Sequence, residues 1–222
     1  MLVLEPIFEA DLQPEQYGYR PERGARDAVK AVHRLINTGH QHVVDADLSG
    51  YFGSIPHPEL MKCVARRIVD RQVLHCIKQW LEVPVEEADG ERGSGRRTTV
   101  NRDERRGTPQ GAPISPLLSN LYMRRFILGW KQLGCERRWS ARIVNYADDF
   151  VICCKTPAHE AMAAMRKIMG RLKLTVNEDK THLCRVPLDQ FDFLGYTFGR
   201  RYKRDTGRAY TGAWPSRKSV QR

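Results

Sequence analysis

The 222-residue sequence lacks the features of a membrane-spanning or secreted protein. No apolar run approaches the roughly 18 to 20 residues that a membrane-spanning helix requires. The first residues, MLVLEP, contain neither a basic segment nor a long apolar core, so a secretory signal is not predicted. We therefore expect a cytoplasmic protein that has no membrane partner.

The sequence also lacks a cysteine pattern for metal binding. Its six cysteines form no CxxC pair and no Cys/His group at zinc spacing. Cys153 and Cys154 are adjacent within an apolar run, where small buried side chains are expected. Reduced thiols fit this distribution.

Acidic residues are too few to balance the basic ones. Thirty-seven Lys and Arg against 26 Asp and Glu give a formal charge of +11. This excess favours a polyanionic partner, because each neutralised phosphate releases condensed counterions, but it does not separate DNA, RNA and anionic membranes. With 41% apolar and 28% charged residues, disordered, collagen-like and coiled-coil chains are excluded.

Helical and strand patterns alternate along the chain without a regular βαβ repeat, which predicts an α+β fold. We expect helices over 25–38, 58–69, 71–81, 115–133 and 157–172. We expect strands over 42–48, 141–145, 150–154, 181–186 and 191–198. The first 24 residues are predicted to be irregular, 84–107 to be a solvated loop or hairpin insert, and 199–222 to be a basic tail.

Two adjacent aspartates, Asp148 and Asp149, separate two apolar runs and predict a hairpin with an acidic tip. Adjacent carboxylates repel each other, and tight turns prefer Asn-Gly or Asp-Gly, so the pair is costly unless a cation binds it. Asp47 follows another apolar strand. Carboxylates from neighbouring strand ends can share two Mg²⁺ ions, the arrangement used for in-line phosphoryl displacement. These residues predict nucleotidyl transfer or nuclease chemistry.

Four motifs in order then resemble the reverse transcriptase domain of bacterial group II intron-encoded proteins. They are 47–52 (DLSGYF), 106–118 (RGTPQGAPISPLL), 146–151 (YADDFV) and 177–181 (NEDKT) with 193–196 (FLGY). The resemblance covers about residues 17–198 and implies a reverse transcriptase palm, an antiparallel sheet backed by helices. It also implies transfer of a nucleotide from a dNTP to the 3′-hydroxyl of a DNA primer on an RNA template, with intron RNA as the template.

The resemblance further assigns roles to individual residues. Asp47, Asp148 and Asp149 would hold two Mg²⁺ ions, with Mn²⁺ as another possible metal, and the Leu48 carbonyl would be an extra ligand. Lys180 would neutralise or protonate the departing pyrophosphate.

Other residues would bind nucleotide and primer. Phe52 would lie under the sugar and exclude a 2′-hydroxyl, Gln110 and Gly111 would line the nucleotide and template, and Arg20 would contact phosphates. Phe193, Leu194, Gly195 and Tyr196 would form the hairpin that grips the primer.

The sequence departs from the family pattern in two respects. Gly53 stands where relatives commonly have Asp, so one acid near the metal cluster is absent. The expected division is partial fingers over 1–41, palm over 42–198 and a tail over 199–222 that leads toward a thumb, and the chain is expected to be truncated at both ends. An RNA-binding remnant that assists intron splicing is therefore an alternative, and a retron or phage-defence reverse transcriptase is a third.

Overall fold

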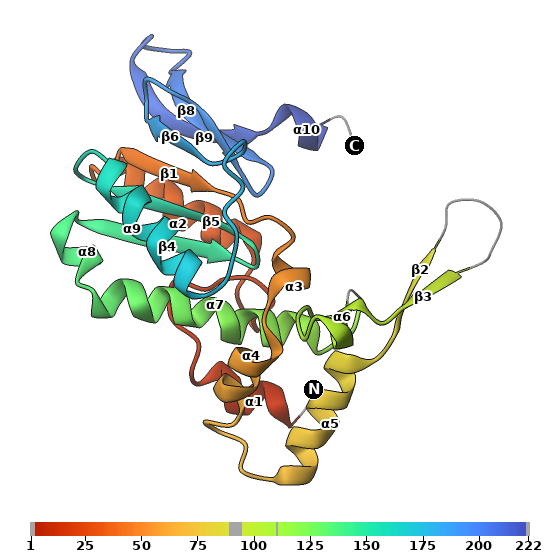
Figure 1. Ribbon diagram of the computed structural model, residues 1–222. Helices are drawn as coiled ribbons and strands as arrows, with labels where there is room; N and C mark the ends of the chain where they lie inside the picture. The colour runs from red at the N-terminus through yellow and green to blue at the C-terminus, as the bar shows by residue number, and fades with distance from the viewer. Residues whose placement is uncertain (1–2, 89–94, 110, 221–222) are drawn as a thin grey trace.

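A four-stranded antiparallel sheet forms the centre of the molecule (Figure 1). The computed structural model describes residues 3–88, 95–109 and 111–220. The strand order is β4 (Ala141–Tyr146), β5 (Asp149–Cys154), β1 (His42–Ala46) and β6 (His182–Arg185). Both β5 and β6 pair antiparallel with β1, as expected for an antiparallel palm.

Alternating side chains of these strands point into two separate cores. Val44 and Phe150 contribute to the larger core and Val43 and Val151 to the smaller one. Because successive residues of a strand face opposite sides, β1 and β5 are apolar on both faces. Each face of the sheet therefore needs its own cover.

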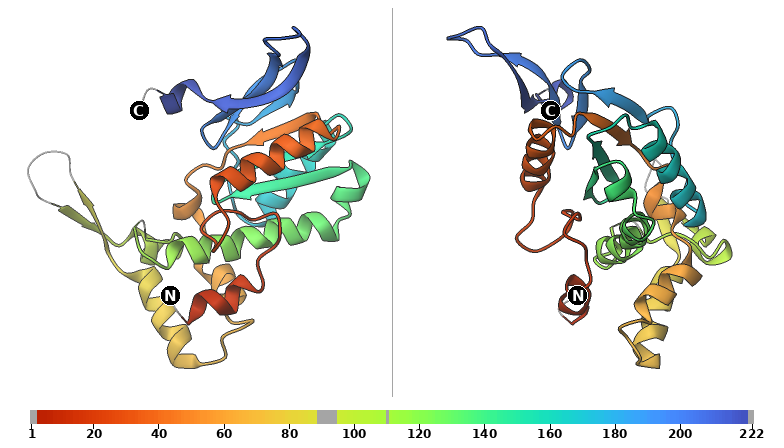
Figure 2. Two further views of the ribbon diagram at one scale, coloured as in Figure 1. Left: turned by 180° about the vertical axis from the view of Figure 1, so that it is seen from behind. Right: turned by 90° about the vertical axis from the view of Figure 1, so that its left-hand side faces the viewer.

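Helices cover the two faces unequally (Figure 2). The larger core includes buried residues of α4 (His57–Val64), α5 (Arg71–Glu82), α7 (Ser115–Gln132) and α9 (His159–Arg171). The smaller core is closed by α2 (Ala25–Asn37), whose Val32 and Ile36 are fully buried. The other short helices include α1 (Leu4–Glu9), α3 (Tyr51–Ser54), α8 (Cys135–Arg138) and α10 (Arg217–Val220).

A second, three-stranded sheet lies beside the first. It has the order β7 (Phe191–Phe193), β8 (Tyr196–Tyr202) and β9 (Ala209–Pro215). Phe191 and Phe198 stack with ring centroids 5.0 Å apart and join the smaller core. This sheet therefore packs against the same face of the palm sheet as α2.

The structure confirms most predicted elements and corrects four. Residues 4–9 form α1 rather than irregular chain. The strand predicted over 191–198 is divided by a turn at Leu194 and Gly195, both with positive φ. The segment predicted to be a basic tail contains β9, one strand of a β-hairpin. The insert predicted over 84–107 ends before Gly107, because Gly107 is buried. Within the insert, β2 (Val85–Ala88) pairs with β3 (Gly95–Thr98), and α6 (Val100–Asp103) follows.

The cysteines lie as the sequence predicts. All six cysteines are free thiols, and Cys153 and Cys154 are fully buried. In the part of the chain that the structure describes, no helix has both the length and the apolar character needed to span a bilayer.

A buried contact connects α4 and α3 to the segment after the insert. The His57 ring donates its Nε2 hydrogen to the Gly107 carbonyl at 2.7 Å, while its Nδ1 is buried without a partner. Gly107 has φ +92°, and a Cβ there would lie 3.0 Å from the Gly53 carbonyl oxygen. Only glycine fits this close approach without strain.

His57 is predicted to make the protein less stable in acid. Burial lowers its pKa below the ordinary 6.5, because a second ring proton would have no acceptor. The unfolded chain therefore binds more protons than the folded one below about pH 6.5, and the free energy of unfolding falls as pH drops. Urea unfolding at several pH values should show this slope, reduced but not abolished in His57→Gln, because burial also lowers the pKa of His40 and His42. An unchanged slope in the variant would contradict the assignment.

Gly53 and Gly107 are predicted to respond oppositely to substitution. A Cβ at Gly53 meets no atom within 4 Å, so Gly53→Asp should unfold at the same temperature as the unaltered protein or higher. Gly107→Ala should lose about 1–3 kcal/mol, because its φ is positive and the Gly53 backbone blocks the new atom. Thermal unfolding measures both, and a strongly destabilised Gly53→Asp would show that the position requires glycine.

Candidate active site

The acidic tip is a two-residue turn between paired strands. Tyr146 pairs with Asp149, which leaves Ala147 and Asp148 as the turn residues, with Ala147 at φ +58°. The Asn145 side-chain amide donates to the carbonyls of Ala147 at 2.8 Å and Asp149 at 3.2 Å. This buried amide fixes the backbone on both sides of Asp148.

The chain before α2 crosses this turn at very short range. The Tyr17 N–H donates to the Asn145 carbonyl at 2.8 Å, and the Asn145 N–H donates to the Glu15 carbonyl at 2.9 Å. A Cβ at Gly18 would lie 2.5 Å from the Ala147 backbone nitrogen. Residues 15–18 therefore act as a short additional strand against the end of β4, and glycine is needed where it passes the turn.

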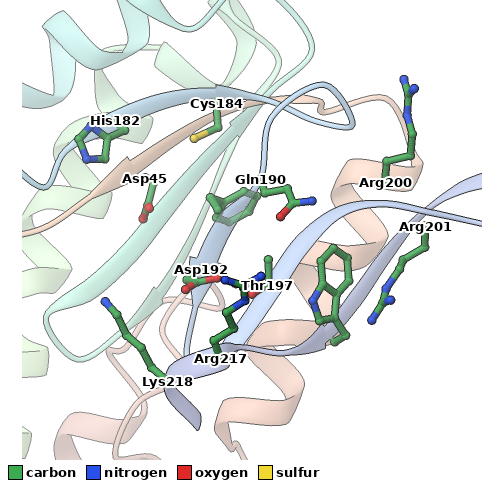
Figure 3. Close-up of a pocket in the computed structure, with 12 residues that line it drawn as sticks. Asp45, His182, Cys184, Gln190, Asp192, Thr197, Arg200, Arg201, Arg217 and Lys218 are labelled. Carbon is green, nitrogen blue, oxygen red and sulfur yellow. The ribbon is translucent and has the colours of Figure 1, made fainter. Parts of the chain in front are cut away.

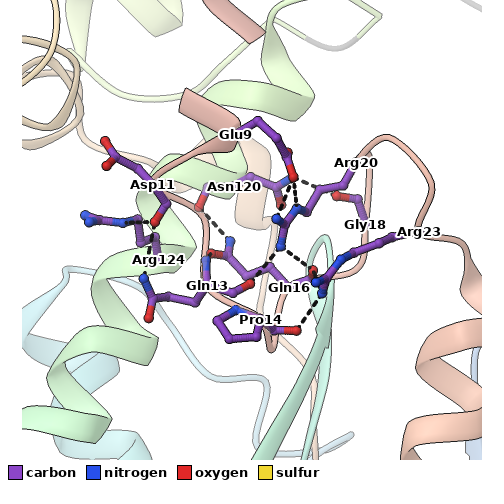
Figure 4. A network of polar contacts seen from close by, with 10 residues as sticks. All are labelled: Glu9, Asp11, Gln13, Pro14, Gln16, Gly18, Arg20, Arg23, Asn120 and Arg124. Atoms are coloured by element: carbon purple, nitrogen blue, oxygen red, sulfur yellow. Dashed lines mark hydrogen bonds and ion pairs between the residues drawn. The ribbon is translucent and has the colours of Figure 1, made fainter. Parts of the chain in front are cut away.

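Buried amides connect this crossing segment to α7 (Figure 4). Gln16 is fully buried and donates to the Asn120 carbonyl at 2.8 Å. Asn120 in turn donates its side-chain amide to the Gly18 carbonyl at 2.7 Å. The position of the acidic turn thus depends on hydrogen bonds that reach α7.

Arg20, which the resemblance predicts to contact phosphates, belongs to the same network. Its side chain is only 7% exposed and pairs with Glu9 of α1 at 2.5 Å. It also donates to the carbonyls of Gln13 at 2.7 Å and Gln16 at 2.9 Å. Its guanidinium is directed into the protein and stabilises the crossing segment.

Asp47 is fixed by the segment that precedes β6. Its carbonyl accepts a hydrogen bond from the Asn177 N–H at 2.9 Å, and its own N–H donates to the Thr181 hydroxyl at 3.3 Å. Lys180 Nζ lies 3.8 Å from Asp47 Oδ2. The predicted residues Asp47 and Lys180 are therefore neighbours.

The negative charges near Asp149 affect its protonation. Desolvation by the surrounding protein atoms, together with the charges of Asp148 and Asp47, raises the pKa of Asp149 to about 6, although its side chain still reaches solvent. The Lys180 ammonium opposes this shift. Asp45 is affected more strongly: desolvation, then Asp149, Asp192 and Asp47, raise its pKa to about 7. Lys180 compensates this group of acids only in part, so a further cation would stabilise it.

An open cleft of about 840 Å³ is lined by Asp45, the acid on which the charge of Asp149 acts (Figure 3). Asp45 and His182 of the palm sheet line one side, and Asp192 and Thr197 of the second sheet line another. Four cations also line it, Arg200, Arg201, Arg217 and Lys218. The cleft therefore combines two acids, Asp45 and Asp192, with four cations that belong to the second sheet and the residues after it.

The acids provide hard oxygen donors of the kind that Mg²⁺ prefers. Among the residues that the structure describes, no three acidic, imidazole or thiol groups lie close enough to share one ion as they stand. The pairing of Ala46 with Phe150 nevertheless brings Asp47 next to Asp149 where β1 ends and β5 begins, with Asp148 in the adjoining turn. The donor chemistry thus suits divalent cations.

The remaining residues were predicted to bind nucleotide, metal or primer, and Phe52 and Leu48 belong to the first two of these groups. Phe52 is half-buried on α3, and its carbonyl accepts from the Thr108 N–H at 2.8 Å, which places the segment before Gly111 next to it. Leu48 is buried in the larger core. Gln110 lies outside the described residues.

The predicted primer-gripping residues form the β7–β8 turn. Phe193 is buried in the smaller core, and Leu194 and Tyr196 pack against it. The Gly195 carbonyl accepts from the Ser216 N–H at 2.8 Å and the Ser219 hydroxyl at 3.0 Å. The start of α10 therefore holds this turn in place.

Sequence reasoning missed the residues that position the turn. Gln16, Asn120 and Asn145 are buried polar side chains, two of them inside predicted apolar elements. A polar residue within an apolar run was the available signal, because buried amides require partners.

The family comparison agrees with this geometry. Residues 1–198 match the family model described as reverse transcriptase (RNA-dependent DNA polymerase). The chain is 30% identical to protein YkfC of Escherichia coli K12, over 92% of this chain and 60% of that protein. It is 27% identical to the group II intron-encoded protein LtrA of Lactococcus lactis, over 81% of this chain and 26% of that protein. The chain thus spans less than two thirds of the length of the first relative and about a quarter of the second.

Solved structures show the same fold at low sequence identity. A telomerase from Candida albicans, in complex with a fragment of telomeric RNA, superimposes with a TM-score of 0.62 at 15% identity, over 88% of this chain and 35% of that one. A truncated apo telomerase from Candida tropicalis gives 0.61 at 12% identity, over 95% and 44%. The chain therefore belongs to the reverse transcriptase family, and its relatives there include group II intron-encoded proteins.

Proposed function

We propose that this chain forms the polymerase core of a group II intron-type enzyme that copies RNA into DNA. The observation that carries the proposal is that Asp47, Asp148 and Asp149 meet where β1 ends and β5 begins, since Ala46 pairs with Phe150 and Tyr146 with Asp149. Asp149 in turn acts on Asp45, which lines a cleft that also carries four cations. Acids suit the metal ions of nucleotidyl transfer, and the cations suit the phosphates of the primer and template.

Asp47, Asp148 and Asp149 would hold two Mg²⁺ ions, or Mn²⁺ in their place, with the Leu48 carbonyl as a further ligand. Such ions activate an attacking hydroxyl and stabilise the charge of a leaving pyrophosphate. Asn145 and Gly18 keep the turn in position, and Lys180 beside Asp47 would donate to the departing phosphate oxygens.

The substrates follow from the family and from the neighbours of the acids. Phe52 would pack against the sugar of an incoming dNTP, with Gln110 and Gly111 beside the base pair. The β7–β8 turn at Phe193–Tyr196 would hold the DNA primer at the cleft, opposite an RNA template. We retain the assignment of 1–41 to fingers, 42–198 to palm and 199–222 to a link toward a thumb as part of this proposal.

A second candidate function is RNA binding without catalysis, in support of intron splicing. Gly53 favours it, because the acid common in relatives is missing there. The cations that line the cleft serve either function.

Extension of a DNA primer on an RNA template, with Mg²⁺ and dNTPs, tests the first proposal. Activity should fall about 100-fold or more in Asp148→Ala/Asp149→Ala, because the metal ligands are removed. The control is Glu104→Gln, which removes an exposed carboxylate outside the four motifs and should leave extension unchanged. If the folded, unaltered chain extends no primer with Mg²⁺ or Mn²⁺, catalysis by this chain is refuted and the RNA-binding function is favoured.

Gly18→Ala is predicted to lower primer extension by about 10-fold or more. The new methyl group would lie 2.5 Å from the Ala147 nitrogen, so the turn carrying Asp148 must shift, and displacement of about 1 Å can cost 100-fold in rate. Gly24→Ala is the matched control, because its Cβ meets nothing closer than 3.9 Å. Equal extension rates for the two variants would show that Gly18 does not position the turn.

A further inference from the structure

The outer half of the β8–β9 hairpin projects beyond the second sheet (Figures 1 and 2). β7 pairs only with Tyr196–Phe198, so from Gly199 onward β8 pairs with β9 alone. We call residues 199–212 the arm. Its residues 200–210 are all exposed, so these residues do not contribute to either hydrophobic core.

The arm and the short helix after it carry unpaired positive charge. Residues 200–220 include seven Lys or Arg and one acid, Asp205. Within the described residues, none of these seven cations lies within 4.0 Å of a carboxylate oxygen, whereas Arg20, Arg67 and Arg166 elsewhere are all paired. Like charges gathered without counter-charges favour a polyanionic partner.

One face of the arm carries a row of flat side chains. Gly199 pairs directly with Gly212, and the residues on their face include Trp214, Arg201 and Tyr210. A Cβ on Gly199 would lie 3.2 Å from the Trp214 ring, and one on Gly212 would lie 3.1 Å from the Tyr210 ring. The paired glycines therefore let both rings lie against the sheet.

Arg201 connects the two rings. Its guanidinium lies 4.2 Å from the centre of the Trp214 ring, a cation–π contact, and it is the direct cross-strand partner of Tyr210. Tyr210 is 47% exposed and thus offers a free aromatic surface. Unpaired bases can stack on a planar cation and a neighbouring aromatic ring of this kind. A duplex, in contrast, can be bound through its phosphates alone.

The row is continuous with the cleft. Arg200, Arg201 and Trp214 line the cleft that also contains Asp45, so a strand leaving this cleft would pass onto the arm (Figure 3). We propose that the arm binds a single-stranded RNA segment, with the Trp214–Arg201–Tyr210 row stacking its bases and the surrounding cations holding its phosphates. The choice of RNA rests on the proposed function, since RNA is the strand that this enzyme would copy.

Fluorescence anisotropy with a labelled single-stranded RNA of about 12 nucleotides tests the inference. The full chain is used, with EDTA and without dNTPs, so binding is measured independently of primer extension. The arm variant is Arg200→Gln/Arg204→Gln/Arg208→Gln. Its matched control, Lys155→Gln/Lys167→Gln/Arg171→Gln, removes the same charge from exposed, unpaired positions on and beside α9.

The arm variant should bind RNA at least about 10-fold more weakly than the unaltered chain. Its slope of log affinity against log salt should become shallower by about 2, because each of the three lost phosphate contacts removes roughly 0.7. The control should change affinity by about 2-fold at most. Tyr210→Ala should weaken binding about 5-fold or more with an unchanged salt slope, while Tyr210→Phe should bind normally. Asp148→Ala/Asp149→Ala should also bind normally, which separates failure of this inference from failure of catalysis.

Three results would overturn the inference. Equal losses in the arm variant and its control would show that charge anywhere on the surface suffices. Equally tight binding of a duplex, with no effect of Tyr210→Ala, would mean that phosphates alone are recognised. Equally tight binding of single-stranded DNA would refute the assignment to RNA.

Discussion

The crossing of residues 15–18 over the β4–β5 turn is the contact on which the rest of the site depends. Ala147 holds a backbone conformation that costs a non-glycine residue about 1 kcal/mol or more, so the turn needs support from outside the hairpin. The Asn145 side chain supplies this support from within β4, and the Gly18 backbone packs against the turn from the other side. Because Gln16 and Asn120 connect that crossing to α7, removal of one buried amide would leave its partners unsatisfied in the core.

Charge is separated along the molecule rather than spread over it. Acids that raise each other's pKa gather where β1 and the β4–β5 turn end, as Asp45 and Asp149 show. Arg200, Arg201, Arg217 and Lys218, which have no carboxylate partner among the described residues, lie in the second sheet or just after it. A polyanion bound along the cleft therefore meets attraction at one end and requires metal ions at the other.

The sequence predicted those parts of the fold that have a strong local pattern. The apolar runs that became β1, β4 and β5, and the acids at their ends, were identified because buried strands are β-branched and bounded by turns. β9 was missed because the arm is exposed on both sides and has no apolar alternation. α1 was missed because it has six residues and depends on burial of Leu4 and Phe8. The role of Arg20 then followed from α1, since its partner Glu9 lies on that helix.

The residues that are hydrogen-bonded within the site lie far apart in the sequence, which affects when the site can form during synthesis. Gln16 bonds a residue 104 positions away, and Asp47 bonds one 134 positions away. Contacts of this kind form late, because closing long loops costs entropy before any burial compensates. On a ribosome, Asp47 would leave the exit tunnel long before Thr181 exists to hold it. Asp47 is therefore held in place only after residue 181 has been synthesised, so a nascent chain that ends before it has no assembled site with which to act on nucleic acid.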